Sequence, residues 1–293
     1  MLSIIICSVS QEKLSQVKAN IAETIGVEHE VIAIDNLKCK YSITKAYNEG
    51  AKQAHFPFLL FVHEDVCFHS YGWGVFLERK LAELDCGVIG FAGSKMFQDV
   101  YSGWWQDDDW LVMFLYQGMR NGTTQLRCEG VTLEHPFVEV VSLDGLALFV
   151  RREVWEEFLF DEEHLTAFHC YDLDFSLRIA ASKKYKNYVC ASHCVIIEHK
   201  SEGNYNQSWY ADTIRMFRNQ WKSILPVAID GLKVAPGKLS KKRERIFYRF
   251  IKQIMATGFP QRKQVLLEFL RFPMSWRHFE HCIKAIWLYW KPR

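Results

Sequence analysis

The first 65 residues alternate between two hydrophobic patterns, and this alternation limits the folds open to the chain. Residues 2–7 (LSIIIC), 29–36 (HEVIAIDN) and 56–65 (FPFLLFVHED) are short apolar runs typical of buried strands. Residues 11–25 and 42–54 instead carry apolar side chains at helical spacing. Strands that alternate with helices predict a sheet with right-handed parallel crossovers. We therefore expect an α/β fold with a mainly parallel central sheet flanked by helices.

The three expected strands all end in polar side chains. These are Ser8 and Ser10 after the first strand, Asp35 and Asn36 at the end of the second, and His63, Glu64 and Asp65 at the end of the third. In sheets of this kind, ligands bind beyond the carboxyl ends of the strands. We therefore expect these side chains to meet at the rim of one binding crevice. The alternative is that each strand simply ends in side chains that face water.

The composition is that of an ordinary globular chain with enough apolar residues for a large core. The 293 residues are 49% hydrophobic and 24% charged. Nine cysteines are scattered without close pairs, which indicates reduced thiols and a cytoplasmic protein. A zinc site formed by Cys190, His193, Cys194 and His199 is the alternative for part of this set. The apolar N-terminal run is too short for a signal peptide or a membrane span.

The pattern of the chain changes near residue 205. We expect an α/β domain over residues 1–204 and a helical, basic region over residues 205–293. Residues 238–293 contain 14 Lys and Arg but only 3 Asp and Glu, a net charge of +11. Since the whole chain carries +2, residues 1–237 carry −9. An acidic body with a basic tail indicates a partner for the tail.

Residues 241–271 and 274–290 are expected to form two basic helices with apolar faces, and two interpretations of them remain open. In the first, the cations lie on an anionic membrane, so that the protein binds its inner face. In the second, the apolar faces pack on the first domain or on a second copy of the chain, as in a homodimer, and the cations meet acidic groups. No nucleic-acid-binding motif accompanies the cations, so we expect no nucleic acid partner.

Seven separated segments occur in an order and spacing that resemble one enzyme family. They are SIIICSVS (3–10), EVIAIDN (30–36), AYNEGAKQA (46–54), FLLFVHEDV (58–66), SLDGLALFVRREVWEE (142–157), YDLDFSLRI (171–179) and VIIEH (195–199). Over residues 2–200 the chain resembles the nucleotide-sugar-dependent glycosyltransferases of the GT-A fold, in particular the broad inverting family 2. The resemblance implies a GT-A-like sheet and a nucleoside-diphosphate sugar as donor.

The resemblance also implies a divalent metal. His63-Glu64-Asp65 aligns with the DxD motif, whose acids hold a metal that bridges the donor diphosphate. Asp65 keeps the last acid, His63 replaces the first, and His199 stands where several such enzymes have a further ligand. Mn²⁺ or Mg²⁺ would neutralise the diphosphate, and Mn²⁺ also accepts imidazole ligands. The alternative for His199 is a strand-end histidine without a metal.

The donor contacts implied by the resemblance are spread along the first domain. They are Ser8, Ser10, Asp35, Asn48, Glu64, Asp65 and Asp144. Asp35 would contact the base or ribose, whereas Asp144 would accept hydrogen bonds from hydroxyls of the donor sugar. A simple turn-forming role is the alternative for Asp144. Asn48 and Gly50 match an Asn-x-Gly helix beside the nucleotide pocket, and tight packing against a strand is the alternative for Gly50.

Asp172 is the residue that the resemblance implies as the general base. It would remove the proton of the acceptor hydroxyl, and a single displacement would invert the anomeric carbon. Tyr171 stands where family members carry Glu. The alternative for Asp172, and the more natural interpretation of Asp174, is an acid in the first turn of a helix. Arg178, farther along this helix, is expected to form an internal salt bridge.

Trp104 and Trp105 belong to an unusual loop, SGWWQDDDW, that combines tryptophan with aspartate. Aromatic faces stack on sugar rings, and nearby carboxylates accept hydrogen bonds from sugar hydroxyls, so the loop is a candidate acceptor site. The alternative is a loop whose tryptophans fill the core.

These observations predict a metal-dependent inverting glycosyltransferase, of the hexosyltransferase type. The expected acceptor is a saccharide or a lipid-linked saccharide, in surface polysaccharide synthesis. A non-catalytic nucleotide- or sugar-binding protein is one alternative, since His63 and Tyr171 depart from the family pattern. A nucleotidyltransferase is another, but it would need a Gly-rich basic loop after the first strand, and SVSQEKLSQ has no glycine.

Overall fold

The computed structural model describes residues 1–119, 121–132, 134–200 and 205–291, and its beginning follows the expected alternation. The first elements are β1 (Leu2–Ser8), α1 (Gln11–Thr24), β2 (His29–Asp35), α2 (Asn36–Cys39), α3 (Ile43–Gln53) and β3 (Phe58–Val62). β1 pairs in parallel with both β2 and β3, and Ser8 lies opposite Asp35. The carboxyl ends of these three strands therefore share one edge of the sheet.

The central sheet has seven strands in the order β10-β13-β5-β12-β3-β1-β2. Its other members are β5 (Cys86–Gly90), β10 (Phe137–Val140), β12 (Ala147–Arg151) and β13 (Lys186–Cys190). β12 runs antiparallel to both β3 and β5, and β10 runs antiparallel to β13. The α/β class is confirmed: β1, β2, β3, β5 and β13 run in one direction, so the sheet is mainly parallel, with β10 and β12 as its two antiparallel members. β12 follows a short turn instead of a helix, and a parallel entry would have needed a longer crossover.

A second sheet lies beside the carboxyl edge of the first. Its strands are β4 (Val66–Phe68), β6 (Ala92–Ser94), β8 (Leu111–Gly118), β9 (Thr124–Glu129), β11 (Ser142–Leu143) and β14 (Ile197–His199), and β7 (Met96–Phe97) pairs separately with β15 (Val227–Ala228). β13 and β14 are close in the sequence but belong to different sheets. β14 pairs with β4, with His199 opposite Val66, so that His199 lies next to the end of the HED segment.

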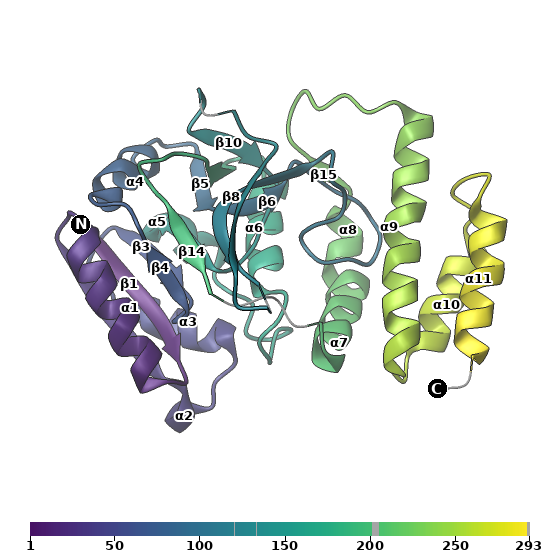
Figure 1. Cartoon of the computed structure of the whole chain (residues 1–293), viewed down its shortest axis with the longest axis horizontal. Coiled ribbons are helices and arrows are strands. Elements are labelled where there is room, and N and C mark those ends of the chain that lie inside the picture. The colour runs from purple at the N-terminus through teal and green to yellow at the C-terminus, as the bar shows by residue number, and fades with distance from the viewer. Residues whose placement is uncertain (120, 133, 201–204, 292–293) are drawn as a thin grey trace.

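Both faces of the central sheet are covered by helices (Figure 1). The remaining helices of the first 200 residues are α4 (Trp73–Leu81), α5 (Arg152–Phe158) and α6 (Tyr171–Ala181). Alternate residues of β1 face opposite cores, as the period of two in a strand requires. Ile5 belongs to a cluster with Tyr47 and Phe175, whereas Ile4 packs in a second cluster with Ile21.

The C-terminal region forms a separate helical layer at the end of the molecule opposite α1 (Figure 1). Its elements are α7 (Gln207–Met216), a π-helical turn (Phe217–Trp221), α8 (Lys222–Ile224), α9 (Pro236–Thr257), α10 (Arg262–Arg271) and α11 (His278–Trp290). The expectation of one helix over residues 241–271 is wrong, because α9 ends before Gly258. Gly258 has a φ of +73°, a left-handed conformation that ends helices, and Pro260 follows it.

The apolar face of α9 packs on the first part of the chain. Ile246, Phe250 and Ile254 share a third core cluster with Met96 and Trp110. Of the two interpretations of the basic helices, packing on the first domain therefore holds for α9. None of the helices in the described part of the chain combines the length and the apolar character that crossing a bilayer requires.

The cations of α9 meet the acids of the loop that contains Trp104 and Trp105. Lys242 forms ion pairs with Asp107 and, at 2.7 Å, with Asp109. Arg245 also pairs with Asp107, and Arg243 pairs with Asp99 at 2.6 Å. The side chains of Lys242 and Asp107 are 7% and 1% exposed, so this pair is largely removed from water.

We predict that Lys242→Ala lowers the free energy of unfolding by about 3 kcal/mol, because it leaves the buried Asp107 carboxylate with one cation less. The neighbouring Lys241 is exposed, and Lys241→Ala is the matched control, with an expected change within about 0.5 kcal/mol. Urea denaturation followed by circular dichroism measures both. Equal stability of the two variants would contradict the assignment of α9 as an anchored helix.

Candidate active site

Glu64 ties the end of β3 to the loop that follows β1. Its Oε2 accepts hydrogen bonds from Ser8 Oγ at 2.6 Å, from the Val9 backbone N–H at 3.1 Å and from the Ser10 backbone N–H at 3.2 Å. Ser10 also caps α1, because its hydroxyl accepts a hydrogen bond from the Lys13 backbone N–H. Three of the expected donor contacts are therefore brought together, and one oxygen of Glu64 is already engaged in holding this loop.

Asp35 lies at the same edge, at the end of β2. It forms an ion pair of 2.9 Å with Lys38, and the hydrogen bond to Lys38 lowers the pKa of its carboxyl group. Its side chain is 30% exposed and so remains open to a ligand. The contact of Asp35 with a base or ribose stays a prediction.

Asn48 has a structural position, which corrects the expectation that it contacts the nucleotide. Its amide nitrogen donates to the Phe160 carbonyl and to Glu162, both at 2.8 Å. Its amide oxygen accepts from Trp155 Nε1 and from the Phe160 backbone N–H, both at 3.1 Å. Because the whole amide is used to join α3 to the segment after α5, no group of Asn48 is left for a ligand.

Gly50 follows the packing alternative. A Cβ atom at this position would lie 2.4 Å from Ile5 Cγ2, so only glycine lets α3 approach β1 this closely.

His63, Asp65 and His199 form a cluster at the junction of the two sheets. Their potential ligand atoms all lie within 4.8 Å of one another, and His199 Nε2 is 3.7 Å from Asp65 Oδ1. Burial and the neighbouring His199 ring lower the pKa of His63 to about 4. His63 is therefore neutral near pH 7 and carries a nitrogen lone pair, as a metal ligand must.

The other nitrogen of His63 is held by Tyr171. His63 Nε2 lies 2.7 Å from the Tyr171 hydroxyl, which in turn donates to the Gly145 carbonyl at 2.9 Å. A hydroxyl has one proton, so Nε2 must be the donor to Tyr171, and the lone pair of His63 is on Nδ1. Gly145 has no room for a side chain, since a Cβ atom there would lie 2.1 Å from the Tyr171 hydroxyl oxygen.

The zinc alternative does not form. His199 clusters with Asp65 and His63 rather than with Cys190 or Cys194. Cys190 is buried within β13, whereas Cys194 is exposed. A second group of potential ligands, formed by Cys67, His69 and Glu198, lies on the neighbouring strand positions of β4 and β14. In this group His69 already forms an ion pair of 2.9 Å with Glu198.

A cavity of about 140 Å³ lies between the cluster of His63, Asp65 and His199 and the start of α6. Its lining residues are His63, Gly103, Trp104, Asp144, Gly145, Phe168, His169, Cys170, Tyr171, Asp172, Leu173, His199, Tyr205 and Trp209. Five site residues predicted from the sequence thus line one cavity: His63, Trp104, Asp144, Asp172 and His199. Asp65 lies behind them, beside His199.

The carboxyl group of Asp172 has a strongly shifted acidity. Burial and the nearby Asp144 carboxylate raise its pKa to about 7, against the opposing hydrogen bonds from the Leu173 and Gly145 backbone. Asp144 Oδ1 accepts a hydrogen bond from the Leu146 backbone N–H at 3.1 Å, so the turn-forming alternative holds for Asp144 although its side chain also lines the cavity. A carboxyl with a pKa near 7 has the acidity that a general base needs.

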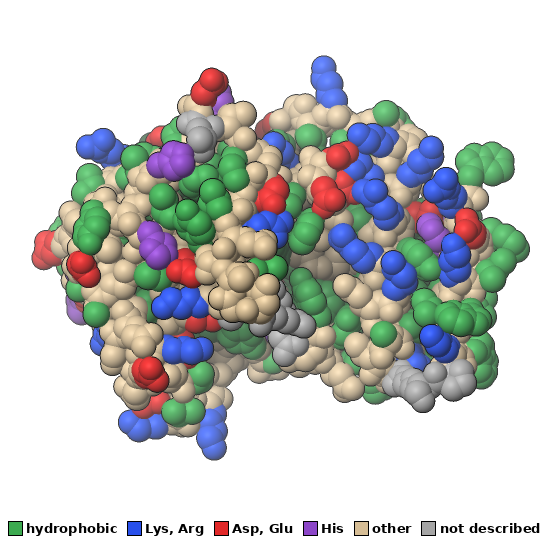
Figure 2. Space-filling model, viewed as in Figure 1, with side chains coloured by type: hydrophobic (Ala, Val, Ile, Leu, Met, Phe, Trp, Pro, Cys, Tyr) green, Lys and Arg blue, Asp and Glu red, His purple; other side chains and the backbone are tan. Residues whose placement is uncertain are grey.

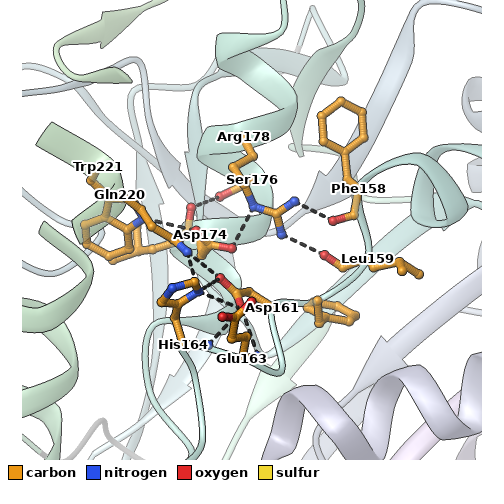
Figure 3. A network of polar contacts seen from close by, with 12 residues as sticks. Phe158, Leu159, Asp161, Glu163, His164, Asp174, Ser176, Arg178, Gln220 and Trp221 are labelled. Carbon is orange, nitrogen blue, oxygen red and sulfur yellow. Dashed lines mark hydrogen bonds and ion pairs between the residues drawn. The ribbon is translucent and has the colours of Figure 1, made fainter. Parts of the chain in front are cut away.

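Asp174, in the first turn of α6, belongs to a network of polar contacts with Arg178 and Trp221 (Figure 3) and is not among the residues that line the cavity. It is fully buried and accepts hydrogen bonds from Arg178 Nε at 2.8 Å and from Trp221 Nε1 at 3.2 Å. Arg178 also donates to the carbonyl of Leu159 at 2.7 Å. The internal salt bridge expected for Arg178 is confirmed, and it fixes the helix that carries Asp172.

The two tryptophans of the candidate acceptor loop occupy different places. Trp104 lines the cavity, whereas Trp105 lies outside it, 36% exposed, with its ring nitrogen donating to Asp108 at 3.0 Å. The acids that were expected beside them for sugar hydroxyls, Asp107 and Asp109, are instead bound by Lys242 of α9.

Three aromatic residues of the cavity were missed by the sequence analysis: Phe168, Tyr205 and Trp209. Phe168 and Tyr205 are half exposed, so they stand at the cavity rim as flat surfaces open to a ligand. The available signal was the aromatic segment YNQSWY (205–210), which lies beyond the end of the expected domain.

A family model described as "Glycosyltransferase like family" matches residues 3–220. The chain belongs to this family. The match includes the edge of the sheet, the cavity and α7, and it ends before α9. No curated protein gave a significant match.

Three solved structures are similar to this family member. The crystal structure of Staphylococcus aureus TarS has a TM-score of 0.52 at 13% identity, covering 97% of this chain and 53% of that chain. TarS 1-349 in complex with UDP-GlcNAc has a TM-score of 0.49 at 13% identity, covering 97% and 79%. GalNAc-T7 with UDP, GalNAc and Mn²⁺ has a TM-score of 0.48 at 11% identity, covering 98% and 57%. The likeness to the first of these shows the GT-A fold alone.

The raised pKa of Asp172 predicts that the ionised Asp172 carboxylate lowers the stability of the folded protein above about pH 7. The folded state binds the Asp172 proton more tightly than the unfolded state, so the stability that this carboxyl contributes falls as the pH rises from about 4 to about 7. We expect Asp172→Asn to melt roughly 2–4 °C above the wild type at pH 8, with the difference disappearing towards pH 4. Thermal unfolding at both pH values measures this.

Asp161→Asn is the matched control for this prediction, because, against the effect of burial, hydrogen bonds from the His164 backbone N–H and from Gln220 lower the pKa of the Asp161 carboxyl, so its loss should lower the melting temperature at pH 8. An Asp172→Asn variant that melts below the wild type at pH 8 would show that the Asp172 carboxylate is stabilised in the folded protein.

Proposed function

We propose that this protein transfers a sugar from a nucleoside-diphosphate donor to a hydroxyl group of a saccharide or lipid-linked saccharide, with inversion at the anomeric carbon. The observation that carries the proposal is the cavity that Asp172, with a pKa of about 7, shares with His63 and His199. Asp172, a possible proton acceptor, thus lines the same small cavity as His63 and His199, which are possible ligands of a cation. Membership of the glycosyltransferase-like family supports transfer over other uses of such a space.

The residues present fit a divalent cation, and Mn²⁺ fits them better than Mg²⁺. His63, Asp65 and His199 offer two imidazoles and one carboxylate within 4.8 Å of one another, a mixed set that Mn²⁺ accepts and Mg²⁺ disfavours. When bound, the cation would neutralise charge on the donor diphosphate. The hydrogen bond from His63 Nε2 to Tyr171 leaves Nδ1 of His63 as the nitrogen that would bind it.

Asp172 acts in this proposal on the acceptor. Its carboxylate takes the hydroxyl proton as the acceptor oxygen forms its bond to the anomeric carbon. The bond between that carbon and the phosphate oxygen breaks, and its electron pair leaves with the nucleoside diphosphate. Because the oxygen attacks opposite the departing group, a single displacement inverts the configuration. Burial supports the role, since it makes the Asp172 carboxylate a stronger base than an ordinary aspartate.

In this proposal the donor and the acceptor bind to different parts of the carboxyl edge of the central sheet. Asp35 and the loop held by Glu64 bind the nucleoside, while Asp144 accepts hydrogen bonds from hydroxyls of the donor sugar. Trp104 and the rim residues Phe168 and Tyr205 offer apolar ring faces to a sugar of the acceptor. The nine free cysteines support a reducing compartment, such as the cytoplasm, in which surface polysaccharide precursors would be assembled.

Donor binding and turnover separate the roles of the two acids. We predict that Asp65→Ala abolishes the Mn²⁺-dependent thermal shift caused by a nucleoside diphosphate, because the cation loses its carboxylate ligand. Asp172→Ala should keep that shift while transfer falls at least roughly a hundredfold. Thermal-shift screening of UDP and GDP and their sugars, with and without Mn²⁺, gives the first measurement, and release of the diphosphate gives the second.

His69→Ala, in the separate Cys67–His69–Glu198 group, is the control for this experiment and should change neither result. Full activity of Asp172→Ala would remove Asp172 as the base. A thermal shift with sugar donors but no transfer to any acceptor would favour a non-catalytic binding protein.

The rate of transfer should depend on the ionisation of Asp172. We predict that kcat rises about tenfold per pH unit below pH 7 and levels off above it, because only the carboxylate accepts a proton. Asp144→Asn should move the rising part of this pH profile to lower pH, since the charge of Asp144 contributes to the raised pKa of Asp172. A pH profile measured at saturating donor tests both, and a rising part that Asp144→Asn leaves in place would contradict the coupling.

A further inference from the structure

Helix α11 has two apolar faces, of which only one is covered. The inner face packs on α9 and α10, where His278 and Ala285 are buried and Cys282 is partly buried. The outer face carries five large apolar side chains that are exposed to solvent: Phe279, Ile283, Ile286, Trp287 and Trp290. Phe279 and Trp290, at its two ends, are 76% and 75% exposed.

The spacing of the outer face is that of a single stripe. Its positions follow one another by four, three, one and three residues, so the side chains lie on one side of the helix along about 17 Å of its length. Trp276, just before the helix, is 99% exposed and extends the stripe. Phe272, at the end of α10, is also exposed. Figure 2 shows hydrophobic side chains along this edge of the molecule.

A groove opens beside the outer face. It has a volume of about 910 Å³ and lies between the start of α9 and the connection from α10 to α11. Leu270, Met274, Trp276 and Phe279 give it an apolar lining, and Lys241 stands on its wall. Since Trp276 and Phe279 belong to both surfaces, the groove and the outer face are continuous.

The cations around this surface differ from those of α9. Lys242, Arg243 and Arg245 of α9 are neutralised by acids of the first domain. In α10 and α11 the acids Glu268 and Glu280 are paired with Arg218 and Lys284. Among the described residues, five cations of this part have no ion pair with a carboxylate: Arg262, Lys263, Arg271, Arg277 and Lys291. The Lys291 ammonium lies 5.0 Å from the centroid of the Trp287 ring, so positive charge without a carboxylate partner adjoins the outer face.

We propose that the outer face of α11 binds the surface of a membrane that contains anionic lipids. An apolar stripe with tryptophans and adjoining cations is the pattern of a helix that lies in the interface between headgroups and acyl chains. α11 has 13 residues, about 20 Å, and is too short to cross a hydrocarbon core of about 30 Å. The helix thus lies along the surface, and the apolar groove beside it offers space for an acyl chain.

The charge pattern favours lipid over a second copy of the chain. In a two-fold dimer the same patch meets itself, so the cations of one copy would be brought into one interface with the cations of the other and would repel them. Anionic headgroups instead complement these charges. This inference does not depend on catalysis. A chain held at a membrane would, however, meet a lipid-linked acceptor at high local concentration.

Flotation with lipid vesicles tests the proposal on the full chain. We expect binding to vesicles of phosphatidylcholine with phosphatidylglycerol, and much weaker binding to phosphatidylcholine alone. The variant Phe279→Ser/Trp287→Ser/Trp290→Ser should lose binding roughly tenfold or more, because its apolar contact area is removed. Arg271→Gln/Arg277→Gln should lose roughly tenfold on the anionic vesicles only, and the wild-type binding should weaken with salt.

The control variant Tyr71→Ser/Leu84→Ser removes two equally exposed apolar side chains far from α11 in the sequence and should bind like the wild type. Thermal melts check that each variant folds. Wild-type protein that stays unbound on anionic vesicles would overturn the proposal. Light scattering that shows a dimer, lost in the α11 variant while vesicle binding is unchanged, would overturn it in favour of a second copy.

Discussion

The hydrogen bond between His63 and the Tyr171 hydroxyl joins the two halves of the candidate active site. His63 follows β3, Tyr171 begins α6, and the hydroxyl continues to Gly145 in the turn before β12, at 2.7 and 2.9 Å. This chain of bonds sets the ring orientation of His63 and places Asp172, the next residue, on the cavity wall. His63 and Tyr171 thus form an imidazole–hydroxyl pair that connects the end of β3 to the start of α6.

The electrostatics of the site oppose the stability of the fold. Asp144 and Asp172 both line the cavity, and burial together with the Asp144 carboxylate makes ionisation of Asp172 more costly. Elsewhere in the molecule buried acids are matched by cations, as Asp174 is by Arg178 and Asp107 is by Lys242. An acid that lacks such a partner keeps a pKa near 7, which suits proton transfer and is paid for in folding free energy.

The C-terminal helices have a buried inner side and an exposed outer side. Their inner side continues the core of the first domain, and the cations of α9 hold the loop that presents Trp104 to the cavity. Tyr205 and Trp209 complete the same cavity from the segment that leads into this region. The outer side of α11 is not needed for folding, since its side chains contact solvent, and this leaves it free for a membrane. The C-terminal region thus lines part of the cavity and, in our proposal, also holds the protein at a membrane.

The sequence by itself determined the strands and helices of residues 2–65 and the edge at which Asp35 and Asp65 lie, because buried strands and amphipathic helices leave distinct periodic patterns. Through family resemblance it also predicted Asp172 as a general base, a role that stays a proposal. Only the tertiary structure showed that Asn48 is used internally, that β12 enters the sheet antiparallel, and that His199 reaches Asp65 through a second sheet. These facts depend on which partners each segment meets, and contacts between residues far apart in the chain leave no local pattern in a single sequence.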